Sequence, residues 1–174
     1  MANCGPGVAA SSFAGQSAGA MNRTIAENIM VVDWTKAMTN GLVSPKKLLD
    51  LASGFIKEFG IKCREGNQFI GELSGGNQQK ASLARFAITD VDVLLLSEPT
   101  RGVDIAARLD LWRYIDSLAA RGKAVILATT DVEEALALSD SIMVMRRGQL
   151  LPEKHLTSRI TPEELTIAAT GGIQ

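Results

Sequence analysis

The sequence predicts an α/β fold in which a mainly parallel sheet is flanked by helices. Three short apolar runs support this prediction: VDVLLL from Val91, AVILA from Ala124 and SIMVM from Ser141. Runs of this kind, with few polar residues, are typical of buried strands in a parallel sheet. A segment with helical periodicity separates each run from the next, and such alternation favours parallel strands joined by helices.

The first strong helix signal lies well before these runs. Lys46–Phe59 is predicted as an amphipathic helix, with Ser44 as its cap, Pro45 in its first turn and Gly60 at its end. Its apolar face is formed by Leu48, Leu51, Ala52, Phe55 and Phe59.

Four further helices are expected, each marked by a cap, a glycine or a turn beside it. They are Asn77–Ala87 after LSGG, Ala106–Ala120 with Leu111, Ile115 and Leu118 inward and Gly122 at its end, a helix capped by Asp131 with Glu134 three residues on, and a last short helix opened by Thr161, Pro162 and Glu164. Gly148 is expected to turn the chain after SIMVM, and residues 151–160 carry few structural signals.

The chain is expected to divide into three parts. Residues 1–21 hold no charged residue and are rich in Ala, Gly and Ser, so they are expected to form a flexible leader. Residues 22–88 are expected to form a helical subdomain, and residues 89–174 an α/β core.

Composition restricts the classes of function. The 174 residues carry a net charge of −1, which favours no nucleic-acid partner, because such partners select a basic patch. Cys4 and Cys63 are far apart and lack metal-ligand spacing, so free thiols in a reducing compartment are expected. No apolar run has the length of a membrane-spanning helix, and the N-terminus lacks a signal-peptide pattern. A cytoplasmic location is expected, with docking onto a membrane partner left open.

Three short motifs occur in a fixed order: LSGGNQQK from Leu73, VDVLLLSEPTRGVD from Val91 and TTDVEEALALSDSIMVM from Thr129. Together they resemble the second half of an ABC-transporter ATPase domain. GGNQQK and PTRGVD resemble, more specifically, the ATPases of ribose- and galactose-type sugar importers, and so does the ending ITPEELTIAATGG. The resemblance covers roughly residues 22–172, which correspond to the C-terminal part of the second of two fused ATPase domains. It implies a partial ABC-type P-loop NTPase fold with a helical signature subdomain.

The resemblance implies a signature loop at the start of the second helix. In this family two ATPase domains sandwich ATP head to tail, and one domain's signature loop contacts the γ-phosphate held by the other. Ser74, Gly75 and Gly76 correspond to that loop, and Gln78 belongs to the same motif. The chemistry is reasonable, because unpaired N–H groups at a helix N-terminus bind anions and glycines allow close approach. A simple helix cap is the structural alternative.

Glu98 corresponds to the general base that polarises the attacking water. The position before it normally holds an Asp for Mg²⁺, but here it is Ser97, and a neutral hydroxyl is a much weaker ligand for a hard cation. Asp92 cannot replace it, because it lies at the opposite end of the strand, and it is expected to be solvated. No metal ligand is therefore assigned.

Two further positions follow from the resemblance. Asp104 matches the loop that communicates between the two ATP sites, and it can also cap the next helix. Thr130 stands where the superfamily often has a histidine that contacts the γ-phosphate. His155, the only histidine, is interpreted as a surface residue in a polar turn.

A P-loop of the pattern GxxxxGK[ST] is absent, because the glycine-rich start of the chain has no lysine and no helix pattern after it. By the resemblance, the aromatic residue that stacks on adenine and the glutamine loop would lie upstream of Met1. ATP and Mg²⁺ are therefore expected only in complex with a partner that bears a P-loop.

Three interpretations remain. The chain is an ATPase subunit, or a fragment of one, of an ABC-type monosaccharide importer, whose partners are a second ATPase domain and membrane permease subunits. It would then lie on the inner face of the plasma membrane. Alternatively, it is a non-enzymatic interaction module or a decayed gene fragment. An ABC-type ATPase of DNA repair or translation is the third interpretation, and the GGNQQK and PTRGVD details and the neutral charge balance argue against it.

Overall fold

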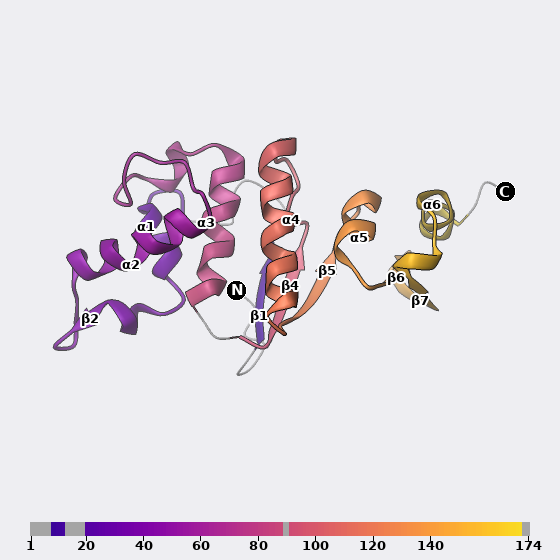
Figure 1. The fold of residues 1–174 in the computed structure, drawn as a ribbon, viewed down its shortest axis with the longest axis horizontal. Coiled ribbons are helices and arrows are strands. Elements are labelled where there is room, and N and C mark those ends of the chain that lie inside the picture. The colour runs from indigo at the N-terminus through magenta and orange to yellow at the C-terminus, as the bar shows by residue number, and fades with distance from the viewer. Residues whose placement is uncertain (1–7, 13–19, 89–90, 172–174) are drawn as a thin grey trace. The chain divides into compact units, whose positions relative to one another are not determined.

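The computed structural model describes residues 8–12, 20–88 and 91–171. The chain divides into two units, residues 1–126 and 127–174, and each is described by itself (Figure 1). The elements in chain order are β1 (Val8–Ser12), α1 (Ile25–Met30), η1 (Trp34–Ala37), β2 (Met38–Thr39), β3 (Leu42–Val43), α2 (Pro45–Glu58), η2 (Ile70–Glu72), α3 (Gly75–Ile88), β4 (Val93–Ser97), α4 (Ile105–Ala120), β5 (Ala124–Ala128), α5 (Val132–Leu138), β6 (Ser141–Arg146), β7 (Gln149–Leu156), η3 (Thr157–Arg159) and α6 (Pro162–Thr170).

The sheet has the order β1-β4-β5, and β1 runs parallel to β4. The pairing aligns Val8 with Val93 and Ser12 with Ser97. For residues 8–12 this corrects the expectation of a flexible leader, because their backbone pairs with β4 although their side chains are small. The rest of the expected leader up to residue 19 lies outside the described residues.

The predictions of strands β4 and β5 differ in outcome. β4 is confirmed, with Leu94 and Leu96 buried. β5 forms where AVILA predicted it, but its residues alternate between exposed and half-buried, and Ile126 is 59% exposed. The expectation of a fully buried strand was therefore wrong here. The physical reason is that β5 lies at the edge of this sheet, next to β4 only.

The helix predictions in the first unit are confirmed to within two residues. Ser44 accepts a hydrogen bond from the amide of Lys47 and caps α2, and Pro45 is its first residue. Gly60 follows with φ 57°, a conformation that favours glycine. The buried residues of α4 include the predicted Leu111, Ile115 and Leu118.

Helix α1 was not predicted, although its sequence contains a capping box. The hydroxyl of Thr24 accepts from the amide of Glu27, and the Glu27 carboxylate accepts from the amide of Thr24. These bonds lower the pKa of Glu27. Five of the six α1 residues are buried, against α2 and α3, so this short helix is stabilised mainly by its packing.

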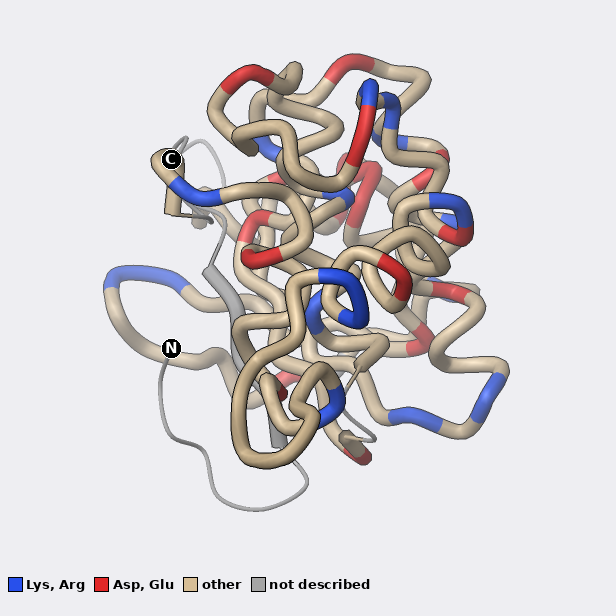
Figure 2. Tube along the Cα trace, turned by 90° about the vertical axis from the view of Figure 1, so that its left-hand side faces the viewer, with Lys and Arg blue, Asp and Glu red and all other residues tan. Residues whose placement is uncertain are grey.

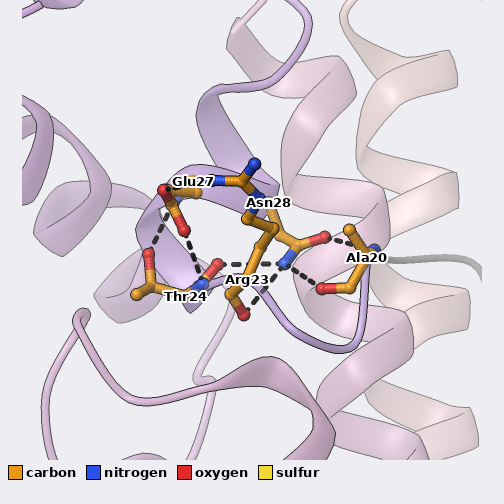
Figure 3. Close-up of polar contacts among 5 residues, drawn as sticks. All are labelled: Ala20, Arg23, Thr24, Glu27 and Asn28. Carbon is orange, nitrogen blue, oxygen red and sulfur yellow. Dashed lines mark hydrogen bonds and ion pairs between the residues drawn. The ribbon is translucent and has the colours of Figure 1, made fainter.

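Asn28 is the most highly connected polar side chain of α1 (Figure 3). It is 3% exposed, and its Nδ2 donates to the carbonyls of Ala20 and Thr24 at 3.1 and 3.0 Å. Its Oδ1 accepts from the amide of Ala20 at 2.9 Å and from Nη2 of Arg85 in α3 at 3.1 Å. Arg85 is itself buried, and burial lowers the pKa of its guanidinium. One amide thus joins the segment before α1 to the end of α3.

The second unit consists of a hairpin and two helices. β6 and β7 pair antiparallel, joined by Arg147 and Gly148 with φ 49° and 77°, as a tight primed turn requires. The structure therefore corrects three expectations: β6 belongs to a separate antiparallel pair, residues 149–156 form a strand, and His155 lies in that strand opposite Ile142. The capping box of Thr161 and Glu164 and the Asp131 cap of α5 are confirmed.

The described residues show neither a membrane-spanning helix nor a segregation of charge (Figure 2). None of the described helices is long and apolar enough to span a membrane. Lys and Arg are interspersed with Asp and Glu along the described trace, in keeping with the net charge of −1 (Figure 2).

We expect Asn28→Ala to lower the free energy of unfolding by about 2–4 kcal/mol, because it removes a bond to a charged group and leaves buried polar atoms without partners. Urea unfolding followed by far-UV circular dichroism measures the change. Asn67→Ala is the matched control, because Asn67 is exposed, and we expect it to change stability by less than about 0.5 kcal/mol. Equal midpoints for the two variants would contradict the role of Asn28.

Candidate functional site

The first turn of α3 carries the predicted signature residues. The helix begins at Gly75, two residues earlier than the sequence indicated, so both glycines are helical. Ser74 and Gly75 are exposed and Gly76 is buried. The hydroxyl of Ser74 accepts from Nδ2 of Asn77 at 2.9 Å. The first amides of a helix have no partner within the helix, so this 14-residue helix presents donors at an exposed turn.

The side chains of Gln78 and Asn77 hydrogen-bond to backbone groups around this turn. Nε2 of Gln78 donates to the carbonyl of Leu73 at 2.9 Å, which closes the loop before the helix. Oδ1 of Asn77 accepts from the backbone amide of Lys62 at 2.8 Å, which attaches the loop to the segment after α2. The structure therefore places the Gln78 amide on the protein's own backbone, whereas Ser74 and Gly75 face outward.

Glu98 follows β4 directly and begins a tight turn. Its φ is 51°, a left-handed conformation that costs a non-glycine residue about 1 kcal/mol. Its carbonyl accepts from the amide of Arg101 at 3.3 Å, and Pro99 and Thr100, the two central residues of this turn, are buried. Such strain is often retained at functional positions, because the surrounding structure must hold it. The turn holds Glu98 at the carboxyl end of β4.

Ser97 and Asp92 lie at opposite ends of the same strand. Ser97 closes β4 opposite Ser12 of β1, whereas Asp92 precedes the strand. The Asp92 side chain is 84% exposed and lies 4.0 Å from Nζ of Lys123. This agrees with the interpretation of Asp92 as a solvated residue at the strand start.

Asp104 caps α4, as the sequence allowed. Its Oδ1 accepts from the amide of Ala107 at 2.9 Å. The same residue lies against α3: a Cβ added at Gly76 would be 3.6 Å from Oδ2 of Asp104 and only 2.7 Å from Cβ of Ala107. The first turns of α3 and α4 are therefore in direct contact, and only glycine fits at position 76. Ser74, Gly75, Gly76, Gln78 and Asp104 form one cluster.

Thr130 lies in the second unit, between β5 and α5, and is exposed. The hydroxyl of the preceding Thr129 accepts from the amide of Asp131 at 3.1 Å, and Asp131 caps α5. Its role at a nucleotide stays a prediction.

Sequence reasoning missed two residues that assemble this cluster, Gln79 and Lys80. Nε2 of Gln79 donates to the carbonyl of Arg101 at 3.0 Å, and Nζ of Lys80 lies 2.7 Å from Oδ2 of Asp110 in α4. Their spacing of three and four positions from Gly76 was the available signal, because such residues share one face of a helix.

A glycine-led helix turn thus lies beside the loop that follows β4, at the carboxyl end of a strand that pairs in parallel. The family model of the ABC transporter matches residues 11–101, more than half of the chain. The chain belongs to the ABC transporter family. The match begins before Asn22, so the expected start of the resemblance was too late, and it includes part of β1.

Curated relatives are sugar-import proteins by name. The chain is 39% identical over 128 residues to a "Putative ribose/galactose/methyl galactoside import ATP-binding protein" of Pseudomonas syringae pv. syringae, with 74% of this chain and 24% of the relative covered. It is 40% identical over 124 residues to the "Arabinose import ATP-binding protein AraG" of Azospirillum brasilense, with 71% and 24% covered. The chain thus spans about a quarter of the length of these relatives.

Solved structures show the same fold. A dimeric ATP-binding cassette in a post-hydrolysis state, bound to ADP and Pi, superposes with a TM-score of 0.68 at 20% identity and covers 85% of this chain and 62% of that one. A putative metal-chelate type ABC transporter in an inward-facing conformation gives a TM-score of 0.73 at 17% identity, with 95% and 64% covered.

Gly76→Ala is expected to lower the free energy of unfolding by about 1–3 kcal/mol, because the new methyl group overpacks the contact with Ala107. Gly54→Ala is the matched control. Gly54 lies inside α2 with nothing within 4 Å of the added atom, so we expect a stabilisation of about 0.4–1 kcal/mol. Thermal unfolding compares the two, and shifts of the same sign would refute the close contact at Gly76.

Proposed function

We propose that this chain is the energy-coupling ATPase component, or a part of it, of an ABC-type monosaccharide importer. In this role it donates its signature loop to ATP held by a second ATPase domain. The observation that carries the proposal is the first turn of α3, where Ser74 and Gly75 are exposed while Gly76 and Asp104 pack behind them. The names of the relatives supply the substrate class.

The residues present fit a γ-phosphate at this turn. Ser74 supplies a hydroxyl, and Gly75 has no side chain to obstruct approach: even an added Cβ would lie 3.7 Å from the nearest atom, the carbonyl oxygen of Gly102. The amides at the start of α3 and the helix dipole favour an anion here. ATP bound by the partner's P-loop would meet these groups.

The fit to Mg²⁺ is poorer in this chain. Ser97 stands at the end of β4 where the family pattern has a carboxylate, and no group of three or more His, Cys, Asp or Glu side chains suited to a metal occurs among the described residues. The proposal therefore assigns Mg²⁺ to the partner's phosphates and P-loop. Glu98 stands at the carboxyl end of β4 and belongs to this chain's own site, so it would polarise an attacking water only at a nucleotide bound there.

A non-enzymatic role is the second candidate, and Ser97 is the observation that favours it. The donor turn comprises Ser74 to Gly76, at the start of α3. A chain whose own site is impaired, but whose donor turn is well formed, would complete or inhibit the ATP site of an intact partner. In either role the proposed partners are a second ABC ATPase domain and membrane permease subunits, at the cytoplasmic face of the plasma membrane.

Equilibrium binding of Mg²⁺–ATP tests the proposal, with the chain alone and mixed with an intact sugar-import ATPase from the same source. We expect no binding by the chain alone, and binding in the mixture at least about tenfold tighter than to the intact ATPase, a gain of about 1.4 kcal/mol. Tight binding by the chain alone, or a mixture identical to the intact ATPase, would refute the donor role.

Gly75→Asp sharpens the same experiment. The added carboxylate has room, and a negative charge at a helix N-terminus favours folding, but it would repel the γ-phosphate. We expect the variant to fold as the wild type does and to lose the gain in the mixture. Gly54→Asp adds the same charge at an open position in α2 and should retain the gain. If Gly75→Asp also retained it, the turn would not face the nucleotide.

A further inference from the structure

One face of α3 packs against α4 and against the loop before α4. Gly76, Gln79 and Lys80 follow the i, i+3, i+4 spacing that places residues on one helix face. All three are buried, although two carry long polar side chains. Figure 1 shows α3 and α4 side by side, and residues of the two helices are in contact. Nε2 of Gln79 and Nζ of Lys80 find partners on the loop and on α4, whereas Oε1 of Gln79 is buried without a hydrogen-bond partner among the described residues.

Lys80 finds its partner on α4. Its side chain is 8% exposed, and its Nζ lies 2.7 Å from Oδ2 of Asp110. This hydrogen bond is the main cause that lowers the pKa of Asp110, with Arg113 and Lys62 adding to it. Asp110 is 49% exposed at its side chain, so it remains hydrated while it pairs with the buried ammonium. The pair fixes α4 along α3 one turn beyond Gly76.

Gln79 forms a hydrogen bond to the loop between β4 and α4. It is 9% exposed, and its Nε2 donates to the carbonyl of Arg101 at 3.0 Å. The amide of Arg101 in turn donates to the carbonyl of Glu98. The side chain on α3 is therefore joined through one residue to the strained turn that holds Glu98. A buried side-chain amide that donates to a loop carbonyl in this way restricts the loop, because loss of the bond would leave the buried donor unsatisfied.

We infer that Gln79 and Lys80 are positioning residues that hold the donor turn, the Glu98 turn and the Asp104 cap in one arrangement before any nucleotide arrives. Neither side chain is directed to the exposed face of the turn, where Ser74 and Gly75 lie. Preorganised donors contribute more to binding and catalysis, because no reorganisation is needed when the ligand is bound. The functional part of this inference rests on the proposed donor role, whereas the mechanical part concerns this chain alone.

Hydrogen exchange of the full chain tests the mechanical part. We expect Lys80→Met and Gln79→Ala each to accelerate exchange of the hydrogen-bonded amides of the two segments, Gln78 in the first turn of α3 and Arg101 and Val103 in the loop before α4, by at least about tenfold, while the amides of α1 and α6 keep their rates. Lys80→Arg preserves the charge and should restore slow exchange. Lys47→Met is the control, because Lys47 is an exposed lysine on α2 whose Nζ donates to the carbonyl of Met38. Unchanged exchange at both segments in the Met and Ala variants would overturn the inference.

Asp110→Asn provides a milder variant in case Lys80→Met fails to fold, because Asp110 is half-exposed. The double variant Lys80→Met/Asp110→Asn should exchange no faster than Lys80→Met alone, since both changes break the same contact. Additive acceleration would overturn the pairing of the two residues as the cause.

The mixture with an intact sugar-import ATPase tests the functional part. We expect the Lys80 and Gln79 variants to reduce the maximal hydrolysis rate at least about tenfold relative to the wild-type mixture, and to weaken Mg²⁺–ATP binding toward that of the intact ATPase alone, because the first turn of α3 supplies the gain in the mixture. Lys80→Arg should restore both. Faster exchange with an unchanged maximal rate would refute the donor role and leave the mechanical part standing. Faster exchange together with a lower rate supports both.

Discussion

A single buried amide, that of Asn28, connects the chain just before and at the start of α1 to α3, 57 positions further along the sequence. It binds both backbone groups of Ala20, the carbonyl of Thr24 at the start of α1 and the guanidinium of Arg85 near the end of α3. A buried polar group must be satisfied, and a buried charge more so, which restricts the ways in which α1 and α3 can pack. The helical part of the first unit is organised around this requirement.

Side-chain contacts therefore fix the position of helix α3 at both of its ends. Arg85 anchors its C-terminal half to α1, and Gly76, Gln79 and Lys80 anchor its N-terminal half to α4 and the loop before it. Only its first turn remains exposed, at Ser74 and Gly75. The exposed amides of that turn therefore belong to a helix whose other faces pack against α1, α4 and the loop before α4. Such a support suits the donor role proposed above.

The chemistry of the chain is asymmetric. The donor turn and the Glu98 turn are both built, whereas Ser97 replaces the carboxylate that the family pattern places before Glu98, and the sequence contains no P-loop pattern. The exposed first turn of α3 is the feature on which the proposed donor role rests.

The sequence by itself determined the features that depend on near neighbours. The Ser44, Asp104, Asp131 and Thr161 caps, the inward face of α4 and the glycine turn between β6 and β7 all follow from spacings of a few residues. The family followed from three motifs in order. The roles of Ser74, Gly75, Gly76, Gln78, Glu98, Asp104 and Thr130 at a nucleotide rest on those motifs and stay predictions.

The tertiary structure alone decided which distant pieces meet. Val8–Ser12 lack the bulky side chains that mark a strand, yet their backbone pairs with β4. AVILA has the composition of a buried strand, but β5 is half exposed because it lies at the edge of this sheet. Arg85 meets Asn28 across 57 positions, and Lys80 meets Asp110 across 30. Local patterns cannot encode such pairs, because a buried polar group requires only that some partner be found, and the packing of the helices determines which one.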